Sequence, residues 1–179
     1  SGELRVQGLG RGGNEPQGTE IRTPGTTSAT TLTTVNGNLV LRGASTATGV
    51  TDQGVLFELL GSASTTGSGN VDVVGRGGGT GGGIGVHLLS GSSVSTTGGG
   101  DLSLTGFGSD SGTRGNNEGV KVDGSVVEVQ SGAGADLNIT GTGGESHTRR
   151  FRPGARVRLR FTHVCVFAYH GHPHRRRRP

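Results

Sequence analysis

Apolar and polar residues alternate in a short phrase that recurs five times along the chain. Each copy opens with a polar residue, places apolar residues at alternate positions and closes at a glycine. The copies are Glu3–Gly8, Asn38–Gly43, Asn70–Gly75, Asp101–Gly106 and Asp136–Gly141, and their first apolar residues are 35, 32, 31 and 35 positions apart. Alternation with period two predicts half-buried strands. A nearly constant spacing in this range is typical of a solenoid or a propeller.

Two further strand-like pieces follow the opening phrase in each repeat. The second starts at another glycine, and the markers are Gly18, Gly54, Gly85, Gly119 and Gly154. Alternation after these glycines would turn one set of residues outward, namely Glu58, His87 and Lys121. The inward set would be Val55, Phe57, Leu59, Val86, Leu88, Val120 and Val122. The third piece is weaker and would turn Leu32, Ala63, Val94 and Val129 inward. The polar loop between the first two pieces varies in length and is expected to carry the insertions.

Three short strands per repeat, joined at glycine-permitted bends, predict an all-β protein. The expected fold is a right-handed parallel β-helix of about five coils of 31–35 residues, with three short strands in each coil. Equivalent residues would stack from coil to coil, so Leu39 would contact Val71 and Val71 would contact Leu102. A propeller is the alternative, but its blades usually need about 40 residues or more and four strands.

Composition fits a solenoid better than a compact globule. The chain has 179 residues, of which 39 are Gly and 28% are hydrophobic, with no Met or Trp and a single Cys. A solenoid coil needs only a few inward residues because neighbouring coils supply the rest of the core. Gly-rich chains are also often disordered, but disorder gives no reason for alternation to stay in phase over five copies. One Cys excludes an internal disulfide framework, and no apolar run is long enough to span a membrane.

The formal charge of +4 divides into two parts of opposite sign. Residues 1–148 hold all 13 acidic and seven basic residues, so they carry −6, whereas residues 149–179 hold ten Arg and no acid. We therefore divide the chain into solenoid repeats (1–148) and a basic Arg- and His-rich tail (149–179). Two interpretations of the tail remain: a capping strand pair with a solvated basic terminus, or a non-native, disordered segment of the kind that a shifted reading frame of a Gly-rich gene produces.

Several candidate chemical sites have a simpler structural interpretation. Asn38, Asn70, Asp101 and Asp136 precede the opening strands, and the last two would lie about 5 Å apart on stacked coils. Such a pair suits a glycosidase or a calcium ion, but short polar residues also satisfy bends. The Gly77–Gly83 match to a dinucleotide motif lacks the expected helix. His163, Cys165, His170, His172 and His174 lie on the tail without metal-site spacing. We expect no catalytic residue, no metal and no cofactor, and we expect His87 to face solvent.

The phrases Gly100–Gly106 and Gly134–Gly141, each followed by a Gly-rich loop, resemble repeats of large bacterial secreted adhesins. These are the filamentous-haemagglutinin-like and autotransporter-type proteins, and the resemblance covers about residues 1–145. It implies a β-helix that forms a long surface shaft, with binding carried by loops or terminal domains. It implies no catalytic residues. It also implies an extracellular or bacterial cell-surface location, and the Ser-Gly start indicates a fragment or a processed chain.

These observations predict a structural or adhesive segment of a secreted or cell-surface β-solenoid, not an enzyme. Its partners would be host or neighbouring-cell glycans or proteins, bound weakly and multivalently by the stacked loops after the first strands. The candidate binding residues are Arg11, Asn14, Asp52, Arg76, Asp110, Arg114, Asn116 and Asn117. One alternative is a β-helical polysaccharide lyase or hydrolase that uses Asp101 and Asp136. Another is a passive rod whose Arg175–Arg178 run binds nucleic acid nonspecifically; no other segment favours nucleic acid.

Overall fold

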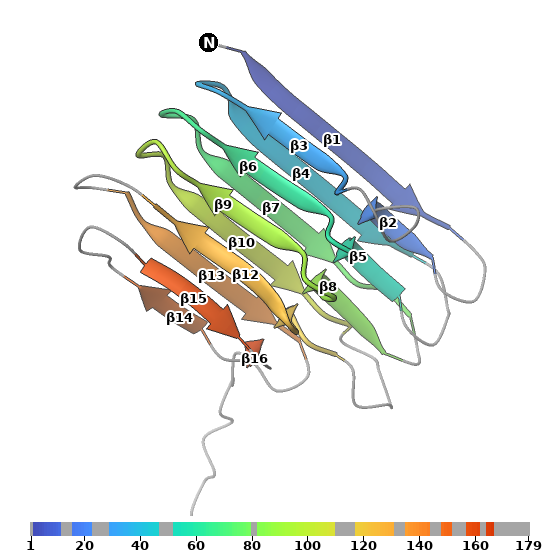
Figure 1. Cartoon of the computed structure of the whole chain (residues 1–179). Helices are drawn as coiled ribbons and strands as arrows, with labels where there is room; N and C mark the ends of the chain where they lie inside the picture. The colour runs from blue at the N-terminus through green and yellow to red at the C-terminus, as the bar shows by residue number, and fades with distance from the viewer. Residues whose placement is uncertain are drawn as a thin grey trace, which may run out of the picture.

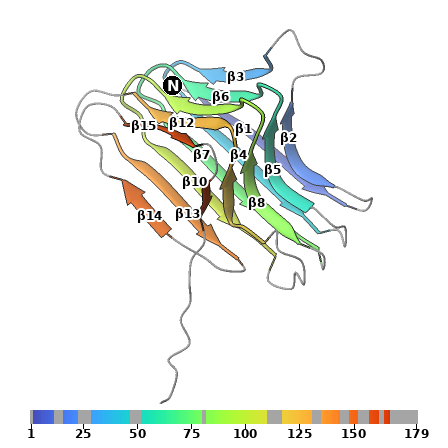
Figure 2. The same ribbon diagram turned by 60° about the horizontal axis from the view of Figure 1, so that its bottom comes forward.

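The computed structural model describes residues 2–11, 16–22, 29–46, 52–79, 82–109, 117–130, 135–143, 148–151, 157–161 and 164–166. These residues form sixteen strands and no helix. The strands lie in three sheets that enclose one narrow core (Figures 1 and 2). The all-β prediction is therefore confirmed.

Each sheet collects the strand that occupies the same place in every repeat. Sheet A contains the opening strands and a final strand, in the order β1 (Glu3–Gly10), β4 (Asn38–Ser45), β7 (Val71–Arg76), β10 (Leu102–Phe107), β13 (Leu137–Thr142) and β14 (Thr148–Phe151). Sheet B has the order β2 (Gln17–Arg22), β5 (Asp52–Glu58), β8 (Gly83–Leu88), β11 (Val120–Val122) and β16 (Val164–Val166). Sheet C has the order β3 (Thr31–Thr34), β6 (Ser62–Thr65), β9 (Ser93–Thr96), β12 (Ser125–Val129) and β15 (Val157–Phe161).

Strands β1 to β13 pair in parallel with their equivalents one coil away, which defines a β-solenoid with three strands per turn. The prediction of a parallel β-helix is confirmed in this respect, but the number of coils is smaller than five. About three turns stack on the first coil, and only β13 of a fifth coil lies parallel to its neighbour. Figure 1 shows this stacking of the three sheets along one axis.

The predicted ladder of opening apolar residues is present. Leu4 pairs with Leu39, Leu39 with Val71, Val71 with Leu102 and Leu102 with Leu137. The last four side chains are at most 1% exposed, whereas Leu4 is 37% exposed because no described strand covers β1 on its other side. The core of the solenoid therefore consists of stacked equivalents, as in other repeat proteins.

Sheets B and C complete the core with their own ladders. Val55, Val86 and Val120 stack in sheet B, and Phe57 beside them is fully buried. The expectation that Leu59 points inward is wrong, because β5 ends at Glu58 and Leu59 is 37% exposed. In sheet C, Ala63 stacks on Val94 and Val94 on Val127. Val129 is buried as predicted. It does not continue this ladder, however, because it pairs with Thr96, two residues beyond Val94. Strands β11 and β12 are separated by only Asp123 and Gly124, so the third strand of this coil begins earlier than spacing suggested.

Insertions are not confined to the loop after the first strand, as the sequence had suggested. In the first coil, β2 ends at Arg22 and β3 begins at Thr31, whereas in the second coil β5 ends at Glu58 and β6 begins at Ser62. The extra residues of the first coil therefore lie between sheets B and C. Length variation therefore occurs at two corners of the solenoid. The pairing register of the strands on either side of each insertion is not shifted.

Glycines form the corner where sheets A and B meet. A Cβ atom on Gly43 would lie 1.9 Å from the carbonyl oxygen of Gly54, and one on Gly75 would lie 1.9 Å from that of Gly85. The same contact recurs in the next coil between Gly106 and Gly119, at 1.8 Å. No side chain fits between the two backbones, so the glycines that mark the repeat in the sequence are the residues that let the two sheets approach.

The strands within the basic tail reverse the direction of the repeats. β14 pairs antiparallel with β13, β15 with β12 and β16 with β11, so one reversed strand lies against each sheet. The expectation that a second strand follows Gly154 in sheet B is wrong, because β15 belongs to sheet C. Residues 167–179, which include the Arg175–Arg178 run, lie outside the described residues.

Candidate binding surface

The outer face of sheet A carries a shallow pocket of about 220 Å³. It lies across the first four opening strands. Its lining residues are Gln7, Gly8, Arg42, Gly43, Ala44, Val74, Arg76 and Phe107. The strand registers place them in two rows. Gln7, Arg42 and Val74 follow one another in the first row, and Ala44, Arg76 and Phe107 do so in the second.

Ala44 explains why this part of the face is hollow. In its row Ala44 lies between Leu9 and Arg76, which are both much larger. A methyl group between two long side chains leaves space above the sheet that neither neighbour fills. The hollow therefore results from the order of large and small side chains in the row that contains Ala44. The backbone keeps its regular coil there.

The two arginines of the pocket differ in their surroundings. The Arg76 guanidinium lies over the ring of Phe107, 5.6 Å from its centroid, which is within the range of a cation–π contact. Among the ion pairs of the described residues, Arg76 has none, and Arg42 has a long one, with Nη2 3.8 Å from Oδ2 of Asp72. Both side chains are exposed. The pocket thus offers two positive groups, an amide and an aromatic edge.

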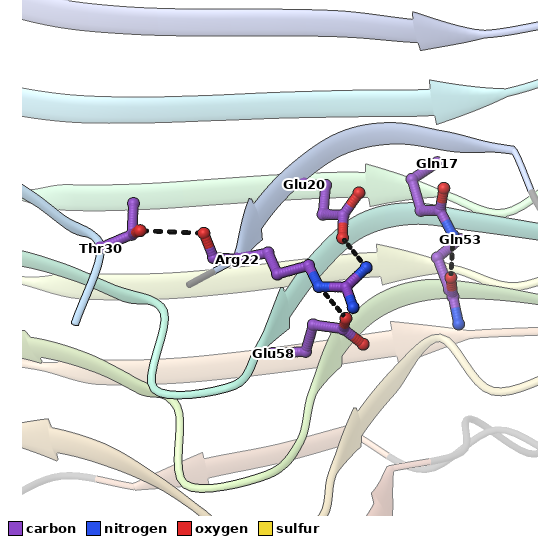
Figure 3. Close-up of polar contacts among 6 residues, drawn as sticks. All are labelled: Gln17, Glu20, Arg22, Thr30, Gln53 and Glu58. Atoms are coloured by element: carbon purple, nitrogen blue, oxygen red, sulfur yellow. Dashed lines mark hydrogen bonds and ion pairs between the residues drawn. The ribbon is translucent and has the colours of Figure 1, made fainter. Parts of the chain in front are cut away.

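On the outer face of sheet B, by contrast, Arg22 is neutralised by two glutamates (Figure 3). Nε of Arg22 lies 2.9 Å from Oε1 of Glu58, and Nη1 lies 3.7 Å from Oε1 of Glu20. The Arg22 carbonyl also accepts a hydrogen bond from the Thr30 hydroxyl, and the Gln17 amide donates to Gln53. Here the guanidinium of Arg22 is paired with one carboxylate of its own strand and one of the adjacent coil, so Arg22 is neutralised in a way that Arg76 is not among the described residues.

The predicted binding residues fall in different environments. Arg11 is exposed directly after β1, and Arg76 ends strand β7 instead of opening a loop. Asp52 is fully buried as the first residue of β5, so it does not present its carboxylate to a ligand as expected. Oδ1 of Asn117 accepts a hydrogen bond from the Gly83 amide at 3.3 Å, which gives this side chain a structural role. Asn14, Asp110, Arg114 and Asn116 lie outside the described residues.

The prediction missed Gln7, Arg42 and Phe107. Each occupies an outward-facing position of an opening strand, next to the closing glycine of its repeat. Aligning the five copies on that glycine would have placed Phe107 beside Arg76 and Arg42 beside Gln7. The signal for these three residues therefore lies in the register of the repeats on the outer strand face, and not in the loops.

Asn70, Asp101 and their equivalents form a ladder that supports the structural interpretation of this position. Oδ1 of Asn38 accepts the Asn70 amide at 3.0 Å, Oδ1 of Asn70 accepts the Asp101 amide at 2.8 Å, and Oδ1 of Asp101 accepts the Asp136 amide at 2.8 Å. A carboxylate used in this way performs the same task as the amide oxygen of Asn. The arrangement satisfies backbone donors at the bend that opens each coil.

His87 is buried, which contradicts the expectation that it faces solvent. Its side chain is 8% exposed, and Nδ1 lies 3.5 Å from Nε2 of Gln53. In sheet B it stacks between Leu56 and Lys121. Burial and the positive charge of Lys121 lower the pKa of His87 from 6.5 to about 4, against an opposing contribution from Asp123. His87 is therefore neutral in the folded protein at neutral pH.

This pKa predicts that acid destabilises the fold through His87. Between pH 6.5 and 4 the unfolded chain binds a proton that the folded chain does not, so stability is present above pH 6.5 and is lost as the pH falls. The full loss is about 3 kcal/mol. Urea unfolding at pH 7, 5.5 and 4 should show a smaller acid effect in His87→Gln than in the unaltered chain. Equal pH dependence in both chains would contradict the assignment.

The described residues contain no group of three or more His, Cys, Asp or Glu side chains that could hold a metal ion. The predicted His and Cys cluster of the tail lies outside them or on a strand, β16, of which only the backbone is described. Within the same described ranges, no helix is long and apolar enough to cross a membrane.

Comparison with known proteins adds no assignment. No family model, no curated protein and no solved structure matches the chain.

Proposed function

We propose that this chain is a structural and adhesive segment of a larger secreted or cell-surface β-solenoid, of the filamentous-haemagglutinin-like or autotransporter type. The support is the register of the coils. Strand ends that flank the loops between sheets A and B, such as Arg76 and Phe107, are paired neighbours, so the points at which these loops begin lie along one edge. A rod that repeats a surface every coil is suited to weak contacts made many times.

The proposed partners are glycans or proteins on the surface of a host or a neighbouring cell, and the proposed location is extracellular or on the bacterial surface. A polysaccharide lyase or hydrolase is less well supported, because Oδ1 of Asp101 is engaged by the Asp136 amide in the ladder that opens the coils. The Asn residues at the equivalent positions perform the same task without a carboxylate. This favours a structural role for the pair over acid–base chemistry.

The test is adhesion by the complete chain displayed at high density. Beads coated with the protein should adhere to bacterial or animal cell surfaces, and the free chain should compete poorly because a single contact is weak. A loop variant with Arg11→Ala, Arg114→Ala and Asn116→Ala should adhere less. The matched control carries Thr33→Ala and Ser64→Ala, which lie on the outer face of sheet C and not on the strands that flank these loops.

Two results would overturn the proposal. One is that coated beads adhere to none of the surfaces at any coating density. The other is that the loop variant and the sheet C variant lose adhesion equally, which would mean that the loops do not carry the contacts.

A further inference from the structure

The pocket on the outer face of sheet A has a chemistry of its own. It holds two guanidinium groups, Arg42 and Arg76, on a body whose residues 1–148 carry a formal charge of −6. Two of the five arginines described on the solenoid are held closely by acids: Arg5 lies 2.8 Å from Glu3 and Arg22 lies 2.9 Å from Glu58. By contrast, Arg42 has one contact of 3.8 Å, to Asp72, and Arg76 has no carboxylate contact among the described residues.

Phe107 holds Arg76 in a defined place. The ring lies one coil away in the same outward row, and the guanidinium lies over it with Cζ 5.6 Å from the ring centroid. Stacking on an aromatic face leaves the edge of the planar guanidinium, with its N–H donors, free to bind another group. A flexible side chain that is already positioned loses less entropy when it binds a ligand.

We propose that this pocket binds a sugar residue that bears a carboxylate, such as a hexuronate. The planar fork of an arginine matches a carboxylate through two parallel hydrogen bonds, and Arg42 adds a second positive charge at the same pocket. The Gln7 amide donates to or accepts from sugar hydroxyls. The volume of about 220 Å³ lies below the range of about 300–1,000 Å³ typical of drug-sized ligands, which suits one small group.

This inference names a ligand class for the adhesive role and rests on that proposed function for its biological setting. Of the pocket residues, Arg76 alone is also a candidate for the loop contacts. The loops connect strands of sheet A to strands of sheet B, whereas Arg42 and Ala44 lie on the outer face of β4. Failure of the pocket would leave adhesion by the loops intact, so the two proposals are tested separately.

The experiment is a titration of the complete ¹⁵N-labelled chain with sodium glucuronate, followed by amide chemical shifts. We expect a dissociation constant on the order of millimolar, with shifts concentrated at the pocket glycines, Gly8 and Gly43. Methyl glucoside, which has the ring without the carboxylate, should bind at least tenfold more weakly. Arg76→Gln and Arg42→Gln should each weaken glucuronate binding about tenfold or more.

Two further variants separate the pocket from general charge attraction. Ala44→Leu fills the hollow without changing charge and should abolish binding. Arg22→Gln removes the same charge from sheet B and should leave binding unchanged. Equal weakening by Arg22→Gln, equal binding of methyl glucoside, tighter binding of a sulfated sugar than of glucuronate, or no shift at the pocket glycines would each overturn the proposal. Amide spectra of the variants establish that each is folded before it is titrated.

Discussion

Gly75→Ala is expected to unfold most of the solenoid. The new Cβ would lie 1.9 Å from the Gly85 carbonyl oxygen, 2.6 Å from its carbonyl carbon and 2.9 Å from Cγ2 of Val86. The first two atoms are backbone, so the contact is relieved only if sheets A and B separate in the middle of the stack. Overpacking a rigid site of this kind costs about 3 kcal/mol or more. Thermal unfolding followed by circular dichroism should show a large fall in midpoint or an unfolded chain at room temperature.

Two other glycines separate the steric effect from the general cost of replacing glycine. Gly2→Ala meets nothing within 4 Å and should change stability by less than about 0.5 kcal/mol. Gly124 has φ of +57° and open space around it, so Gly124→Ala should cost about 1–2 kcal/mol through backbone strain alone. If Gly75→Ala lowered the midpoint of thermal unfolding no more than Gly124→Ala does, the close approach of sheets A and B would not be essential for stability.

The second large effect is expected from truncating the middle of the apolar ladder in sheet A. Leu102 is fully buried between Val71 and Leu137. Leu102→Ala would leave a cavity that neighbouring coils cannot close, because their backbones are held at strand spacing by hydrogen bonds. The expected loss is about 3–5 kcal/mol, measured by urea unfolding at neutral pH.

Leu4 provides the matched control on the same ladder. It occupies the equivalent position but is 37% exposed, with a coil on only one side among the described residues. Leu4→Ala should therefore cost about 1 kcal/mol. Equal losses at Leu4 and Leu102 would contradict the account in which stacking on both sides supplies the stability of each coil.

The opening strands could be predicted residue by residue because two independent signals agreed there. The alternation of apolar and polar residues predicted that Leu39, Val71 and Leu102 point inward. The closing glycines predicted the register, so the pairing of each strand with its equivalent in the next coil followed. In the third strand the apolar signal is a single residue per coil. The junction between β11 and β12 has only two residues, and this was enough to shift the partner of Val94 from the expected Val129 to Val127.

The surface could not be predicted to the same degree. Period-two alternation says which side chains leave the core but not which of them remain covered, so His87 and Leu56 point outward in sheet B and are both buried. The pocket depends on residues from four successive coils, among them Gln7, Arg42 and Phe107. Their proximity follows only once the coils are laid over one another. No local motif marks any of them in the chain.

The stacking direction also determines how the rod responds to tension. The hydrogen bonds between coils run along the solenoid axis, so a pull on the two ends loads them along their length. Each coil contacts only its neighbours, so an end coil can peel away while the others remain folded. A coil of 31 residues, such as Val71 to Asp101, then releases roughly 100 Å of extended chain in place of about 4.8 Å of rod. Such a tether would lengthen in steps and absorb work at each step, which a chain that unfolds all at once does not do.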